Sequence, residues 1–224
     1  MYKIKSPNFT HVKQRNINMV ILHHTNMISS DAALTRMCDP AAIVSAHYLI
    51  DKYNGSTTQL VEDRLIAHHA GESFWQGEQA LNNCSIGIEL DNDGSEEFSD
   101  ILMTSLLDLL KDLVEKYSIS SDRILGHLDI APWRKLDPHH KFDWKLLSEH
   151  GFGLYPTVES NDFGASEQDP SDRLLRLGYN IQDLKATIIA FNTHFNPKSY
   201  DNNCVDVWTN SSNIYLDNLL TQIK

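Results

Sequence analysis

The chain has 224 residues, of which 41% are hydrophobic, and its formal net charge at pH 7 is −11. This length and composition suit a globular protein with a real core, long enough for one ordinary domain and a small second one. The excess of acidic residues argues against non-specific binding to nucleic acid or to anionic membranes, so we expect no nucleic-acid partner.

The cysteines and the amino-terminal segment bear on the cellular compartment. Cys38, Cys84 and Cys204 are odd in number and far apart, which disfavours both a disulfide framework and a thiolate zinc site. The first residues lack the apolar core of a signal peptide, and we expect no transmembrane segment. The sequence as written therefore predicts a cytoplasmic protein, or a periplasmic or envelope-associated one if a signal has been trimmed.

Apolar patterns predict alternating strands and helices through the first two thirds of the chain. Strands are expected at residues 18–23, 46–51, 57–61, 85–90 and 124–125. A turn at 53–56 predicts that the second and third of these strands form a hairpin. Helices are expected at 30–37 and at about 99–117, the latter from leucines at helical spacing. This order of elements indicates an α/β fold.

The composition changes after Pro156, which divides the chain into two predicted domains. We expect a catalytic domain at 1–156, a polar and acidic linker at 157–168, and a helical domain at 169–224. Apolar stripes in the last segment predict three short helices. Because this segment carries no obvious catalytic constellation, it is typical of a binding or docking module.

Residues 126–138 place an imidazole, an ammonium and a carboxylate close together, on His127, Lys135 and Asp137. Two prolines keep this segment from forming a regular helix. His23 ends an apolar strand, and Glu89 closes another. Open sheets place their sites at the carboxyl ends of strands, so these residues are expected to share one site. Two histidines and one aspartate suit a catalytic zinc with an open position for water.

Each of these residues also has a structural alternative. His23 can be a hydrogen-bonded structural histidine, Lys135 a solvated charge, Asp137 a turn residue and Glu89 an edge residue facing solvent. Their occurrence together, in this order, favours the shared site. Adjacent strand residues point to opposite faces, so only one of His23 and His24 can easily face it.

Five motifs occur in order, at residues 22–25, 45–50, 69–71, 83–90 and 126–138. With them the sequence resembles the zinc-dependent N-acetylmuramoyl-L-alanine amidases of the type 2 family, which have AmpD-like and AmiD-like branches. The resemblance covers about residues 15–156. The tail resembles, less closely, the helical peptidoglycan-binding domain of the AmiD-like branch.

The resemblance implies a mixed central β-sheet flanked by helices, followed by a small three-helix domain. It implies one zinc ion held by His23, His127 and Asp137. Glu89 matches the catalytic acid, and Lys135 matches a residue that stabilises the oxyanion. Segments that line the family's groove make further residues candidate substrate contacts: His69, Tyr48, Asn83 and Trp133.

The implied reaction is hydrolysis of the amide between N-acetylmuramic acid, or its 1,6-anhydro form, and L-alanine of the stem peptide. The partners are then peptidoglycan fragments or muropeptides, in wall turnover or recycling. The alternative is a non-catalytic muropeptide receptor on the same fold. His139 and His140 stand where the family often has a Gly-Pro pair. They are exposed loop residues, hydrogen-bonding partners of the substrate, or ligands of a second ion. The preferred muropeptide, the stem-peptide preference and the oligomeric state stay open.

Overall fold

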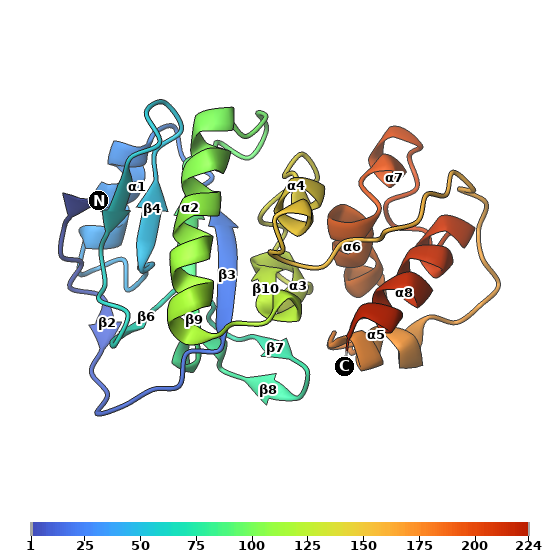
Figure 1. The fold of residues 1–224 in the computed structure, drawn as a ribbon, viewed down its shortest axis with the longest axis horizontal. Coiled ribbons are helices and arrows are strands. Elements are labelled where there is room, and N and C mark those ends of the chain that lie inside the picture. Colours follow the sequence, from blue (N-terminus) through green and yellow to red (C-terminus); the bar gives the residue numbers. More distant parts are fainter. Residues whose placement is uncertain (1, 224) are drawn as a thin grey trace.

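The structure is a computed structural model that describes residues 2–223, and its centre is a six-stranded mixed sheet (Figure 1). In spatial order, the strands are β1 (Tyr2–Lys3), β5 (Thr57–Gln59), β4 (Tyr48–Ile50), β9 (Ser85–Leu90), β3 (Met19–His24) and β10 (Ile124–Gly126). Strands β4 and β5 pair antiparallel, as the predicted hairpin requires, and the other neighbours are parallel. The predicted fold class is confirmed.

Several short elements were not predicted, because two or three residues carry no readable periodicity. Two small antiparallel pairs join β2 (Phe9–Thr10) to β6 (Ile66–Ala67) and β7 (Phe74–Trp75) to β8 (Glu78–Gln79). Two 3₁₀ turns, η1 (Leu81–Asn83) and η2 (Ser121–Arg123), precede β9 and β10.

Four helices belong to the same part of the chain, which we call the N-terminal part (residues 2–156). They are α1 (Ser30–Cys38), α2 (Asp100–Tyr117), α3 (His127–Ile130) and α4 (Trp144–Glu149). The Ser99 side chain accepts a hydrogen bond from the Leu102 amide and so caps α2. Helix α2 lies across one face of the sheet and buries its leucines there (Figure 1).

The alternation of side chains along β3 decides which face of the sheet carries polar groups. Val20 and Leu22 belong to the core beneath α2, whereas Met19 and Ile21 belong to a second core on the opposite face. Because the period of a strand is two residues, His23 also points away from α2.

The C-terminal helical part (residues 169–223) contains α5 (Ser171–Leu177), α6 (Leu184–Phe195), α7 (Lys198–Asp201) and α8 (Asn210–Gln222). Three of these match the predicted helices, and the single-turn α7 was not expected. The second core extends without interruption from Ile21 and Leu128 to Leu177 and Phe191. The helical part is thus packed on the N-terminal part over a continuous apolar interior.

The predicted linker lies against the last helix. The Thr157 amide donates to Asn218 Oδ1 at 2.9 Å, and the Ser160 amide donates to the Tyr215 hydroxyl at 3.1 Å. The domain boundaries themselves stay a prediction. No helix in residues 2–223 combines the length and apolar character needed to cross a bilayer. The three cysteines are free.

Candidate metal centre and catalytic site

Three predicted ligand side chains converge on one point at the carboxyl ends of the central strands. His23 Nδ1 lies 2.9 Å from His127 Nδ1, and Asp137 Oδ2 lies 3.1 Å and 3.2 Å from these two nitrogens. His23 is near the end of β3, and His127 directly follows β10, which is the parallel neighbour of β3. The sheet topology therefore brings two residues 104 positions apart into contact.

The protonation states of these groups fit a cation. Burial, followed by the neighbouring His127, lowers the pKa of His23 to about 4, which leaves a neutral imidazole. Burial alone raises the pKa of Asp137, but the adjacent His127 and His23 hold it well below its usual value. Two histidines and a carboxylate with about 3 Å between donor atoms match a catalytic zinc site, whose ligands lie ~2.0–2.2 Å from the ion.

A chain of hydrogen bonds fixes the tautomer of His23. The Ser85 hydroxyl donates to the Leu81 carbonyl at 2.6 Å, so it accepts from His69 Nε2–H at 3.3 Å. His69 Nδ1 then accepts from His23 Nε2–H at 3.0 Å. This direction leaves the lone pair on His23 Nδ1, the atom that faces the other two ligands. Such outer partners orient a ligand and raise its basicity.

His127 is oriented in the same way by the backbone. Its Nε2–H donates to the Ala70 carbonyl at 3.2 Å, which leaves Nδ1 free for a metal. Arg134 donates to the same carbonyl and to that of Glu72, so it holds this loop in place. The motif at 69–71 therefore supplies a partner to both histidine ligands.

Glu89 lies beside the three ligands on the neighbouring strand. It is in register with His23 across the β3–β9 pair and lines the same groove as Lys135 and Asp137. Burial, followed by the negative charge of Asp137, raises the pKa of Glu89 to about 8, against the lowering effect of Lys135. Among residues 2–223, its Oε2 atom has no hydrogen-bond partner. A carboxyl of this kind can exchange a proton near neutral pH.

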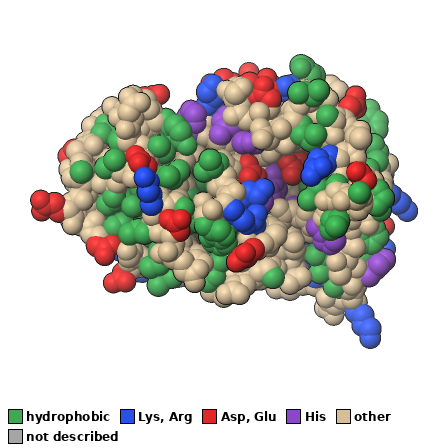
Figure 2. All heavy atoms as spheres, turned by 180° about the vertical axis from the view of Figure 1, so that it is seen from behind, with side chains coloured by type: hydrophobic (Ala, Val, Ile, Leu, Met, Phe, Trp, Pro, Cys, Tyr) green, Lys and Arg blue, Asp and Glu red, His purple; other side chains and the backbone are tan. Residues whose placement is uncertain are grey.

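These groups lie in an open groove of about 650 Å³ on the face of the sheet opposite α2. The groove has basic walls, supplied in part by Arg36, Arg134 and Lys135. Figure 2, which views the molecule from behind, shows histidine and basic side chains around a hollow on this face. The volume and the basic walls of this groove suit a partly anionic ligand.

The four predicted substrate contacts are placed differently from one another. His69 lines the groove, where it also supports His23. Tyr48 points the other way, into the core beneath α2, and its hydroxyl donates to Asp63 at 2.5 Å. Asn83 ends η1 outside the groove lining, and Trp133 packs against the second core. The geometry therefore does not support direct substrate contact by these last three.

His24, His139 and His140 form a separate aromatic group. His24 lies on the other side of its strand from His23, with its ring centroid 5.1 Å from that of His139. His140 stacks on Tyr200 of α7 at 3.9 Å. Within the described chain, the cluster of His23, His127 and Asp137 is the single group with metal-ligand spacing, so the second-ion alternative gains no support.

One buried acid of the site has no role predicted from the sequence. Asp129 is fully buried, and its carboxylate accepts hydrogen bonds from the Gly126 amide at 2.8 Å, the Tyr179 hydroxyl at 2.6 Å and His194 Nδ1 at 2.8 Å. An aspartate flanked by Leu128 and Ile130 was the available signal, because a buried charge requires partners. Two of these partners, Tyr179 and His194, lie 50 and 65 residues away in the chain.

The fold and the site together define a class. A carboxylate and two imidazoles form a donor set with an open side, and the half-buried Glu89 stands beside it, as metal-assisted hydrolysis requires. The family model for N-acetylmuramoyl-L-alanine amidase (Amidase_2) matches residues 13–140, and the chain belongs to this family.

Curated relatives agree with this family. The chain is 33% identical over 215 residues to the N-acetylmuramoyl-L-alanine amidase AmiD of Escherichia coli (strain K12), covering 83% of this chain and 77% of AmiD. It is 45% identical over 103 residues to the 1,6-anhydro-N-acetylmuramyl-L-alanine amidase AmpD of Haemophilus influenzae (strain Rd), covering 46% of this chain and 55% of AmpD.

Solved structures match over nearly the full length. E. coli AmiD in complex with the substrate anhydro-N-acetylmuramic acid-L-Ala-D-gamma-Glu-L-Lys gives a TM-score of 0.83 at 26% identity, covering 96% of this chain and 98% of that one. AmpDh3 from Pseudomonas aeruginosa gives 0.81 at 23% identity and 99% coverage of both chains, which supports the fold alone.

Proposed function

We propose that this protein is a zinc-dependent amidase that cleaves the bond between the lactyl group of N-acetylmuramic acid, or its 1,6-anhydro form, and L-alanine of the stem peptide. The observation that carries the proposal is the convergence of His23, His127 and Asp137 beside Glu89 in a chain of this family. The complex of E. coli AmiD with an anhydromuramyl peptide supports muropeptides as partners in peptidoglycan turnover or recycling.

The residues of the site have distinct tasks in this reaction. When bound, a zinc ion supplies Lewis-acid polarisation of the scissile carbonyl and lowers the pKa of water. Glu89 takes the proton from the attacking water and delivers it to the departing L-alanine nitrogen, a role that suits a pKa of about 8. The Lys135 ammonium stabilises the negative charge on the carbonyl oxygen, an effect worth about 3 kcal/mol for a well-placed donor.

A muropeptide receptor without catalysis is the alternative function. Such a receptor needs the groove but neither a complete ligand set nor a proton carrier. The presence of both in this chain favours the enzyme. The cytoplasmic location expected from the amino-terminal sequence stays a prediction.

Mass spectrometry of muropeptide digests tests the proposal. The purified protein is offered an anhydromuramyl peptide and a reducing muramyl peptide side by side, with and without a zinc chelator. Release of free stem peptide that the chelator abolishes is the expected result, and the ratio of the two rates gives the preferred substrate. Retention of zinc with no peptide release would instead support the receptor.

A further inference from the structure

The buried carboxylate of Asp129 connects the two parts of the molecule. Asp129, Tyr179 and His194 are each at most 1% exposed, so their hydrogen bonds are shielded from water. Two of the three donors to this carboxylate come from the helical part. Burial and the nearby Asp129 raise the pKa of the Tyr179 hydroxyl well above its usual value, so it stays a proton donor.

Asp129 in turn fixes the short helix that begins with a metal ligand. Its side chain accepts from the Gly126 amide and so closes the turn between β10 and α3, whose first residue is His127. The Leu128 amide donates to the Asp137 carbonyl at 2.8 Å. The position of α3 therefore sets the backbone of both His127 and Asp137.

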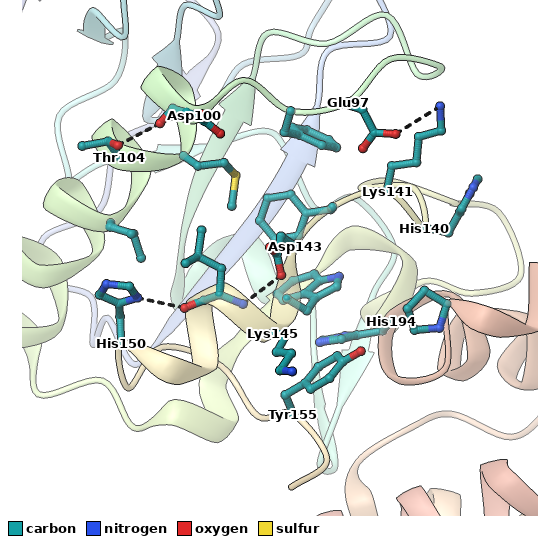
Figure 3. Close-up of a pocket in the computed structure, with 17 residues that line it drawn as sticks. Glu97, Asp100, Thr104, His140, Lys141, Asp143, Lys145, His150, Tyr155 and His194 are labelled. Carbon is teal, nitrogen blue, oxygen red and sulfur yellow. Dashed lines mark hydrogen bonds and ion pairs between the residues drawn. The ribbon is translucent and has the colours of Figure 1, made fainter. Parts of the chain in front are cut away.

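The helical part also contacts the chain that follows Asp137. The His194 ring stacks on Trp144 of α4 at a centroid distance of 3.7 Å, and Tyr200 stacks on His140. A second pocket of about 630 Å³ is lined by His194 together with Lys145 and Tyr155 of the N-terminal part. Figure 3 shows these side chains around it. The helical part thus contacts Asp129, which lies between the proposed ligands His127 and Asp137, and also His140 and Trp144, which follow them.

We propose that Tyr179 and His194 are positioning residues for the metal centre, acting through Asp129 on His127 and Asp137. In this arrangement the helical part is a structural brace of the metal-binding loop, whether or not it also docks on the cell wall. The inference rests on the proposed zinc amidase function. It concerns the affinity of the site for zinc, which is measured separately from turnover.

The test compares zinc affinity between two tyrosine variants of the full chain. Tyr179→Phe removes one donor to Asp129 and keeps the ring. The control Tyr215→Phe, also in the helical part, removes a buried hydroxyl that bonds to Ser160 of the predicted linker. Competition of the metal-free proteins with a chromophoric chelator gives the zinc Kd. We expect Kd to rise about 10-fold for Tyr179→Phe and to stay at the wild-type value for Tyr215→Phe.

A second pair of variants separates hydrogen bonding from packing at His194. His194→Phe keeps a ring against Trp144 but has no donor, and His194→Asn keeps a side-chain N–H near the position of Nδ1. The brace requires weaker zinc binding for His194→Phe and a Kd closer to wild type for His194→Asn.

The outcomes distinguish the brace from the enzyme. Equal zinc Kd values for Tyr179→Phe, Tyr215→Phe and wild type would overturn the brace and leave the amidase untouched. The brace also fails if His194→Asn binds zinc as weakly as His194→Phe. Wild-type protein that binds one zinc ion but releases no stem peptide would refute the proposed function, while the comparison of Kd values would still decide the brace.

Discussion

At the scale of single residues, the half-buried Glu89 lies next to the three proposed metal ligands. Replacement by glutamine keeps its volume and removes its capacity to carry a proton. We expect Glu89→Gln to bind zinc as the wild type does and to lose about 10²–10⁴-fold in turnover, the usual contribution of general acid–base catalysis. Chelator competition and stem-peptide release measure the two properties on the same preparation.

Glu62→Gln is the matched control for this variant, because Glu62 is exposed and pairs only with Arg64 among residues 2–223. It is expected to change neither zinc binding nor turnover. Turnover of Glu89→Gln within a few-fold of the wild type would remove Glu89 from the mechanism.

His47 is fully buried and links strand β9 to the segment that precedes β6. Its Nδ1 accepts from the Gly87 amide at 3.0 Å, and its Nε2–H donates to the Leu65 carbonyl. Burial, followed by the charge of Arg15, lowers its pKa to about 3, below the ~6.5 of an unfolded chain. The stabilisation is therefore full above pH ~6.5 and is lost as the pH falls from ~6.5 towards about 3.

Linkage gives a magnitude for this loss. Between about pH 7.5 and pH 5.5, His47 alone lowers the free energy of unfolding by about 1.4 kcal/mol. Urea unfolding of metal-free protein at the two pH values measures it. His47→Asn should show a pH difference smaller by this amount, and the exposed His150→Asn serves as the control. An unchanged pH difference in His47→Asn would mean that another group carries the effect.

At the scale of elements, the polar face of β9 depends on a residue without a side chain. A Cβ atom on Gly87 would lie 2.3 Å from Cγ of His69. The His69 ring packs directly over Gly87 and hydrogen-bonds to His23. We expect Gly87→Ala to displace His69, to weaken zinc binding, and to lower the free energy of unfolding by about 1–3 kcal/mol through overpacking. Urea unfolding and zinc competition measure these two changes.

A double variant shows whether the clash is the cause. In a His69→Ala background the obstructing ring is absent, so Gly87→Ala should no longer destabilise the sheet. Zinc binding should remain weak there, because His23 has lost its partner. A cost of Gly87→Ala that is the same in both backgrounds would place the clash elsewhere.

Apolar periodicity predicts the longer elements of the sheet and its covering helix well. Strands β3 and β9 and helix α2 appear within one or two residues of their expected bounds. Periodicity does not show which face of a strand points toward the groove and which toward α2. Tyr48 was expected in the groove, but the pattern of β4 alone does not state that Tyr48 and Ile50 point toward α2. Strand order and register decide this, and they depend on residues distant in the chain.

At the scale of the whole molecule, the main difference from the sequence expectation is that the helical part packs tightly on the N-terminal part. A polar segment at 157–168 indicated a linker, yet it bonds along α8, and one core runs through both parts. The motif that contains Asp129 could be read locally, but its partners Tyr179 and His194 follow 50 and 65 residues later. Pairings of this range leave no periodic trace in the sequence.

A continuous core predicts cooperative unfolding, because the unfolding of either part would expose apolar surface of the other to water. Leu216 of α8 is fully buried in the shared core, and Leu216→Ala should cost about 2–5 kcal/mol. We expect calorimetry to show a single transition that moves down in temperature as a whole. Leu106→Ala, in the core beneath α2, is the matched variant and should move the same transition.

Zinc binding at the proposed site measures the extent of this cooperativity. Added zinc should raise the transition temperature of any unit that contains the site, because an ion that binds only the folded state stabilises that state. Calorimetry measures this temperature. In Leu216→Ala the whole transition should still respond to zinc. A different result would be a new transition at lower temperature that does not shift with zinc, while the original transition stays in place. The helical part would then unfold alone, and the shared core would not make the two parts unfold together.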